Sequence, residues 1–170
     1  MGIFSKIFGS SPNNGSPPDN KRIQQTNNNI KVTGTRSYGD GTKYVGEFIN
    51  GVENGQGRIN FSDGAYYAGE WKDGKYHGQG KKSWFNADDY IGSWEEDKRV
   101  GFGKHFYADG SIYEGEWKDD RRNGQGKQTY PDGRVYEGEW KTDMYHGQGV
   151  YTLADETKQT GEFMDGEFVG

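Results

Sequence analysis

The sequence predicts an all-β protein that forms one elongated antiparallel sheet in a single layer. Three observations support this prediction. A stretch rich in glycine and aromatic residues recurs with a period of 23 residues. Within each period, glycine and aromatic residues alternate with other types, which is the two-residue periodicity of a β-strand. Only 29% of the 170 residues are hydrophobic although 15% are aromatic, which favours a thin aromatic core over an aliphatic core between two layers.

The first 29 residues lie outside the repeats and divide into two segments. Residues 1–8 (MGIFSKIF) form a short amphipathic segment, which we expect to dock on a membrane or in the groove of a partner protein. The alternative is a chance apolar cluster without a role. The apolar residues would share one face of a helix: Ile3, Phe4, Ile7 and Phe8. Residues 9–29 are mostly Pro, Ser, Asn and Gly and predict a flexible linker, so that the whole N-terminal tail is expected to be disordered.

Residues 30–170 form the repeat array. Each repeat contains a Tyr-x-Gly-x-aromatic stretch followed by Gly-x-Gly. Five copies begin at Tyr44, Tyr67, Tyr90, Tyr113 and Tyr136. A sixth, degenerate copy contains Gln159 and Phe163, which suits a terminal capping repeat. The array therefore has about five full repeats with partial terminal repeats, and each repeat is expected to contact only its neighbours.

Each repeat predicts two short strands and two connections. The sequence FSDGA predicts a three-residue hairpin loop, a type I turn followed by a left-handed glycine, because this loop places Phe61 and Tyr67 on the same face. The other connection, KDGKYHG, is expected to be longer and polar. The resulting meander would have about 11 or 12 strands.

The two faces of the sheet are expected to differ. One face would carry the aromatic residues lying over glycines, and this face would form the core. The other face would be solvated, because its glutamates lie on strands next to basic residues. These are Glu47, Glu70, Glu116, Glu139 and Glu162, with Arg58, Lys81, Lys104 and Lys127 beside them. The third repeat has Asn86 and Ala87 in place of Asp-Gly, so a local irregularity is expected near residues 85–100.

Composition and motifs argue against several classes of function. The net charge is −5, of which residues 1–29 contribute +2 and the array −7, and an acidic array disfavours nucleic acid. There are no cysteines, and His77 and His146, although equivalent in position, would lie roughly 29 Å apart. We therefore expect no metal site and no cofactor. The absence of a nucleophile elbow or phosphate loop predicts a protein that is not an enzyme. Without a secretory signal or an apolar span in the sequence, a cytoplasmic location is expected, with peripheral membrane contact as an option.

These motifs resemble the MORN (membrane occupation and recognition nexus) repeat family. The clearest copy is YAGEWKDGKYHGQG at residues 67–80, and the resemblance covers about residues 32–170. It implies an elongated, twisted sheet of stacked hairpins. It also implies a non-catalytic role as a scaffold, an oligomerisation module or a contact for membrane lipids.

Two functional hypotheses follow. The first is a scaffold or adaptor that binds a protein partner, or a second copy through its end strands, and is tethered through residues 1–8. The second is a module that binds phospholipids or glycans through exposed aromatics. Under either hypothesis the aromatic face would supply contacts, although these residues are more simply the core: Tyr67, Trp71, Trp94, Tyr113, Trp117, Tyr136 and Trp140. Loop contacts are expected from Lys75, Tyr76, His77, Tyr145 and His146.

Overall fold

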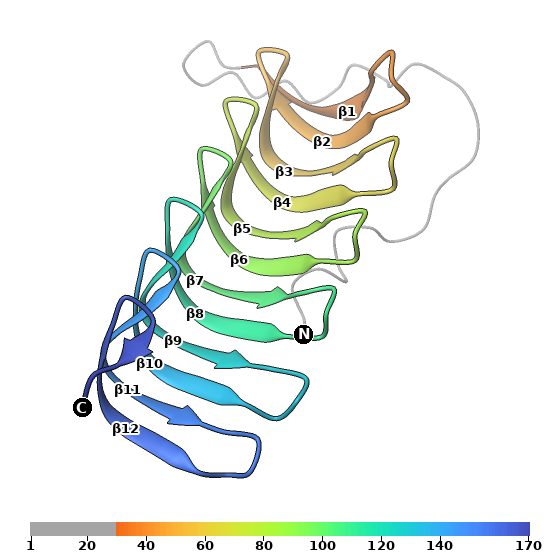
Figure 1. The fold of residues 1–170 in the computed structure, drawn as a ribbon. Coiled ribbons are helices and arrows are strands. Elements are labelled where there is room, and N and C mark those ends of the chain that lie inside the picture. Colours follow the sequence, from red (N-terminus) through yellow and green to blue (C-terminus); the bar gives the residue numbers. More distant parts are fainter. Residues whose placement is uncertain (1–29) are drawn as a thin grey trace.

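The structure, a computed structural model, describes residues 30–170 as one open sheet of thirteen antiparallel strands (Figure 1). The strand order in the sheet follows the chain, which confirms the predicted single-layer meander. Residues 1–8 and 9–29, for which a docking segment and a linker were predicted, lie outside the described residues. The strands are β1 (Lys31–Ser37), β2 (Lys43–Ile49), β3 (Val52–Asn60), β4 (Tyr66–Lys72), β5 (Lys75–Ser83), β6 (Asp89–Glu95), β7 (Lys98–Phe106), β8 (Ile112–Lys118), β9 (Arg121–Thr129), β10 (Val135–Lys141), β11 (Met144–Thr152), β12 (Lys158–Met164) and β13 (Glu167–Phe168).

Glycines from neighbouring strands line up across the sheet. Gly69 of β4 pairs with Gly57 of β3 on one side and with Gly80 of β5 on the other. The ring of Tyr67 lies over this row, and a Cβ added at Gly80 would approach the ring to 2.6 Å. The repeated glycines are therefore the floor on which the tyrosine rings lie.

The core consists of interlocked tyrosine and tryptophan rings. The five repeat tyrosines are fully buried. Tyr67 packs edge to face on Trp71 of its own repeat and on Trp94 of the next, with ring centroids 5.3 and 5.5 Å apart. Its hydroxyl donates to the carbonyl of Glu70 (2.9 Å), and Trp71 Nε1 donates to the carbonyl of Gly57 (3.1 Å). The same pattern in successive repeats joins neighbours into one aromatic column.

The sheet bends into a trough (Figure 1). The aromatic face lies on the inside, because Arg99 and His105 meet across the bend and His105 packs by Trp117. Gly69 pairs with Gly80 but Glu70 pairs with His77, so β5 has a bulge of two residues at which Gly78 takes a φ of 56°. The bend brings together side chains that a straight strand would hold about 20 Å apart. In β7, for example, Arg99 Nη1 lies 2.8 Å from His105 Nδ1, six residues further along.

The three-residue loops have the predicted geometry. Phe61 donates its N–H to Ala65 (2.9 Å), Gly64 donates to Phe61 (3.1 Å), and Gly64 has a φ of 90°. The irregularity predicted for residues 85–100 is absent, because the third repeat forms the same loop with Ala87 in the left-handed region (φ 69°). Asn86 fills the role of the usual aspartate by accepting the N–H of Asp88 (3.2 Å).

The prediction of a longer second connection is wrong. Asp73 and Gly74 form a two-residue turn in which both residues have positive φ, 51° and 78°, as in a type I′ hairpin. The Lys-Tyr-His residues that follow belong to β5, because the bulge absorbs the extra length. At Thr142 and Asp143 the same turn forms without any glycine, at φ values of 51° and 69°.

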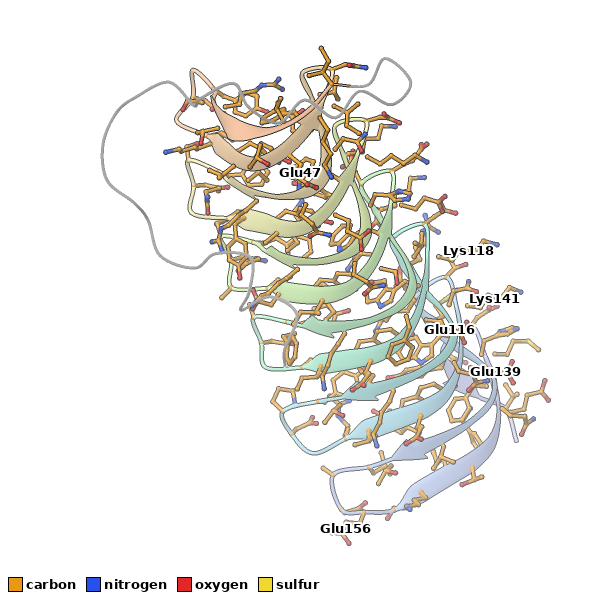
Figure 2. All side chains as sticks on the ribbon, turned by 180° about the vertical axis from the view of Figure 1, so that it is seen from behind. Glu47, Glu116, Lys118, Glu139, Lys141 and Glu156 are labelled. Carbon is orange, nitrogen blue, oxygen red and sulfur yellow. The ribbon has the colours of Figure 1, made fainter. Side chains whose placement is uncertain are left out.

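On the outer face, the predicted pairing of charges across strands holds for Glu47, which pairs with Lys31 (2.8 Å), but other glutamates of the column have a different role. Glu116 accepts the N–H of Gln125 (2.9 Å) and Glu139 that of Gln148 (3.0 Å), so these carboxylates cap the bulges (Figure 2). The lysines pair instead with acidic residues nearer the loops, as in Lys104–Glu114 (2.9 Å). Lys118 and Lys141 point away from the sheet (Figure 2). The outer face therefore combines polar groups that satisfy one another with a few exposed apolar side chains, such as Phe102 and Ile91.

Candidate functional site

The seven aromatic residues predicted as contacts are buried. Tyr67, Tyr113 and Tyr136 are fully inaccessible, and the four tryptophans are at most 6% exposed. They form the core of the trough, and a partner approaching the concave face would first meet the side chains that cover them. A direct role of these rings in binding stays a prediction.

The residues predicted as loop contacts lie on strands and divide between the two faces. Tyr76 is buried and stacks on Tyr67 with centroids 3.8 Å apart. Tyr145 stacks in the same way on Tyr136. By contrast, His77 and His146 lie on the outer face, and the exposed Lys75 forms an ion pair with Glu96 (3.3 Å). These five residues therefore do not form one surface.

A strip of side chains that vary more between repeats than the core tyrosines and tryptophans covers the aromatic core on the inside of the trough. Its members lie nine, fifteen and seventeen positions after each repeat tyrosine. We call this set, in the second to fifth repeats, the inner strip: Tyr76, Lys82, Trp84, Arg99, His105, Tyr107, Arg122, Gln128, Tyr130, Tyr145, Tyr151 and Leu153. Sequence reasoning named only two of them. The sequence does contain a signal for this surface. Alternation places these positions on the aromatic face, and the residue type at a given position varies between some of the repeats.

Two arginines of the inner strip lie flat on core tryptophans. The guanidinium of Arg99 is 4.1 Å from the centroid of Trp117, and that of Arg122 is 4.3 Å from that of Trp140. Each arginine is also held by the aspartate of the following turn, at Nε–Oδ1 distances of 3.0 and 3.2 Å. Stacking and ion pairing fix the two guanidiniums at equivalent places in adjacent repeats.

Lys82 is a half-buried cation of the inner strip. Its ammonium lies 4.8 Å from the ring centroid of Tyr76 and 5.3 Å from that of Trp84. Within residues 30–170, no carboxylate lies at ion-pairing distance from it. Burial lowers the pKa of Lys82 below its ordinary value. The two rings therefore supply its close electrostatic partners in the described part of the chain.

His105 is a buried neutral group in the third repeat. Burial and the positive charge of Arg99 lower the pKa of His105 to about 4, although Asp88 opposes the shift. Its Nδ1 accepts from Arg99, so the proton resides on Nε2, which lies 3.5 Å from Asp88 Oδ2. The ring stacks on Tyr107 with centroids 4.1 Å apart. The ring is thus held by its stack on Tyr107 and by Arg99 at Nδ1, while Nε2 makes no hydrogen bond within the described residues.

Two adjoining cavities open on the inner strip around Arg122 and Tyr130. One of 260 Å³ is lined by Tyr107, Asp109, Ser111, Arg122, Gln128 and Tyr130. The other, of 250 Å³, is lined by Arg122, Tyr130, Trp140, Asp143, Met144, Tyr145 and Gly166. Each is of a size for a side chain rather than for a large cofactor.

The described residues show neither a metal cluster nor a membrane-spanning helix. Between residues 30 and 170, no group of three or more His, Asp or Glu side chains could hold a metal ion. In that same range, no helix is long and apolar enough to cross a bilayer.

Comparison with known proteins identifies the repeat. The family model of the MORN repeat matches five times, at residues 44–66, 67–88, 90–112, 113–133 and 136–158. No curated protein matches the chain. Among solved structures, the fold is similar to the SAS-4 (dCPAP) TCP domain of Drosophila melanogaster, in a complex with a proline-rich motif of Ana2 (dSTIL). That match has 12% identity and a TM-score of 0.46, and it covers 90% of this chain and 99% of that chain. Because the five family matches together cover most of the chain, with the repeat tyrosine in each, the protein belongs to the MORN repeat family.

Proposed function

We propose that the protein is a non-enzymatic scaffold that binds a protein partner along the inner strip. One observation carries this proposal: the concave face carries the positions that vary between repeats, above all the fifteenth (Lys82, His105, Gln128 and Tyr151), whereas the recurring tyrosines and tryptophans are buried beneath them. The MORN repeat is itself a non-catalytic repeat type.

The chemistry of the inner strip suits a protein ligand. It combines tyrosine, tryptophan and arginine, the residue types enriched at the energetic centres of protein interfaces. Their rings are already fixed by stacking, so little side-chain entropy would be lost on binding. The outer face offers fewer free groups to a partner, because Glu116 and Glu139 accept backbone N–H groups and Lys104 is paired with Glu114.

Attachment through residues 1–8 belongs to the same proposal. The apolar side chains of this segment would anchor the array at a membrane or on a second protein, in the cytoplasm. Direct binding of anionic lipid by the array is disfavoured by its charge of −7. Vesicle flotation tests whether residues 1–8, and not the array, attach the protein to a membrane. The full chain should float with anionic vesicles. A full-length variant with serine at Ile3, Phe4, Ile7 and Phe8 should not float. Flotation of the variant would contradict tethering through this segment.

Site-specific photo-crosslinking tests the binding surface. A photoreactive phenylalanine is placed in the full chain at Trp84 or Tyr151 on the inner strip, or at the outer-face residue Phe102, which is 60% exposed. In cells of the native host, we expect the two inner-strip positions to capture the same protein and Phe102 not to capture it. Capture at Phe102 alone, or at none of the three positions, would refute the proposal.

A further inference from the structure

The third and fourth repeats carry the same polar arrangement on the inner strip. Arg99 donates Nη1–H to Nδ1 of His105 (2.8 Å), and Arg122 donates Nη1–H to Oε1 of Gln128 (3.1 Å). In both repeats the remaining contacts of the arginine are identical, with Nε and Nη2 donating to the aspartate of the next turn. The two sites can therefore be compared group by group.

They differ at the position two residues before the repeat tyrosine. The third repeat has Asp88, whose carboxylate accepts the backbone N–H of Ala108 (2.8 Å) and lies 3.5 Å from His105 Nε2; the fourth repeat has Pro131, which lacks an N–H, in place of Ala108. The fourth repeat has Ser111, which is 4% exposed and whose Oγ has no hydrogen-bond partner within the described part of the chain. The 260 Å³ cavity lies at this position of the fourth repeat, between Tyr107 and Tyr130. The fourth repeat thus has a cavity at the position where the third has an internal carboxylate.

The cavity has more hydrogen-bond donors than acceptors. Arg122 has five N–H groups and uses three of them, so two are left. The side-chain amide of Gln128, which is 2% exposed, accepts from Arg122 and has both N–H donors free in the described structure. The hydroxyls of Ser111 and Tyr107 are also available. A ligand that fits must therefore be rich in acceptors.

From this comparison we propose that the cavity of the fourth repeat binds a carboxylate, supplied by an acidic side chain of the protein partner. The carboxylate would take the place that Asp88 has in the third repeat, and would accept from Ser111, Gln128 and Arg122. That a partner protein supplies the carboxylate rests on the proposed function. The ligand chemistry itself rests on the donors of the cavity.

Nearby charges determine how the site would attract its ligand. Asp109 lines the cavity and accepts the N–H of Ser111 (2.8 Å), while Asp143 pairs with Arg122. These two carboxylates outweigh the single positive charge of Arg122 and leave a local charge of −1, so the long-range field opposes the approach of an anion. Binding depends instead on directed, charge-assisted hydrogen bonds from donors that are themselves largely buried, Ser111 and Gln128 among them, at the base of an open cavity.

An NMR titration of the full chain tests the cavity directly. Acetate is the probe, acetamide its neutral isostere, and sodium chloride at equal ionic strength the control for salt. We expect acetate to shift the side-chain amide signals of Gln128 and the indole N–H of Trp140 in a saturable way, at least tenfold more strongly than acetamide. Equal responses to acetate and acetamide would overturn the assignment of a carboxylate.

Substitutions at two equivalent positions provide matched controls. Ser111→Asp places the protein's own carboxylate in the cavity and should abolish the acetate response, whereas Ser111→Ala removes one donor and should weaken the response only a few-fold. Asp88→Ser opens the third repeat and should create a second acetate-dependent shift at the indole of Trp117. An unchanged response in Ser111→Asp would refute the site.

Crosslinking at Trp84 and Tyr151 in the Ser111→Asp variant decides whether a partner protein supplies the carboxylate. If a partner's acidic side chain fills the cavity, Ser111→Asp should reduce capture at both positions. If acetate binds but capture is unaffected by the variant, the site serves a free small carboxylate and the inference about the partner fails. If acetate does not bind while capture persists, the inference fails and the proposed function stands.

Discussion

At the scale of single residues, the glycines under the tyrosine rings are required for space and not for backbone freedom. Gly103 has no positive φ, and a Cβ there would lie 2.4 Å from the ring of Tyr90, which cannot move because it is fully buried. Gly103→Ala should therefore lower the free energy of unfolding by about 3 kcal/mol. Gly133 has a φ of 91° and open space around it, so Gly133→Ala should cost about 1–2 kcal/mol through strain alone. Urea unfolding measures both, and equal costs would contradict this distinction.

His105 makes the stability of the third repeat depend on pH. Its pKa is about 4 in the folded protein and 6.5 in the unfolded chain, so below pH 6.5 the unfolded chain binds a proton that the folded protein does not. Stability should therefore fall as the pH drops from 6.5 to 4, by about 2–3 kcal/mol at pH 4.5. The control is His105→Gln, which introduces the residue that the next repeat has at this position, Gln128. Urea unfolding at pH 7.5 and 4.5 should show a smaller loss in the variant, and an equal loss would rule out His105 as the cause.

At the scale of single elements, the loops keep one geometry even where the sequence departs from it. Ala87 has a φ of 69° at the place that glycine holds in the loop of the fourth repeat, Gly110. Ala87→Gly should stabilise the protein by about 0.5–1 kcal/mol, because relief of left-handed strain exceeds the added entropy of the unfolded chain. The matched change Ala108→Gly, at a loop position without positive φ, should destabilise it by a similar amount. Thermal unfolding distinguishes the two, and a loss of stability in both would contradict the strain.

At the scale of the whole molecule, the array is a one-dimensional stack in which each repeat contacts its neighbours. Deletion of residues 113–135 removes one full period and lets Tyr90 meet Trp140 as it now meets Trp117. This 23-residue deletion should leave a cooperatively folded protein with native near-UV circular dichroism. Deletion of residues 113–124 breaks the period and should disrupt the C-terminal strands. Cooperative unfolding of both proteins, with equal near-UV signals, would contradict the stacking rule.

Local pattern sufficed to predict much of the fold. The period of 23 residues predicted the repeat array, and the alternation of residue types predicted the aromatic face. The sequence FSDGA predicted the loop that the structure shows at Phe61 to Ala65. The turn at Asp73 was misjudged because the bulge that shortens it depends on how β4 pairs with β5. A bulge is a property of two strands in register, and neither sequence displays it alone.

The candidate site was less accessible to sequence reasoning. Periodicity directed attention to the tryptophans, which are the core, whereas the cavity at Ser111 depends on side chains that do not recur. By itself, the sequence determined the strands, their order, their faces and the three-residue loops, since these follow from residue alternation and turn chemistry. Only the tertiary structure decided which face is concave and which side chains meet across the bend. Arg99 and His105 touch because the bulge folds their strand back on itself, and that curvature comes from register and packing between strands.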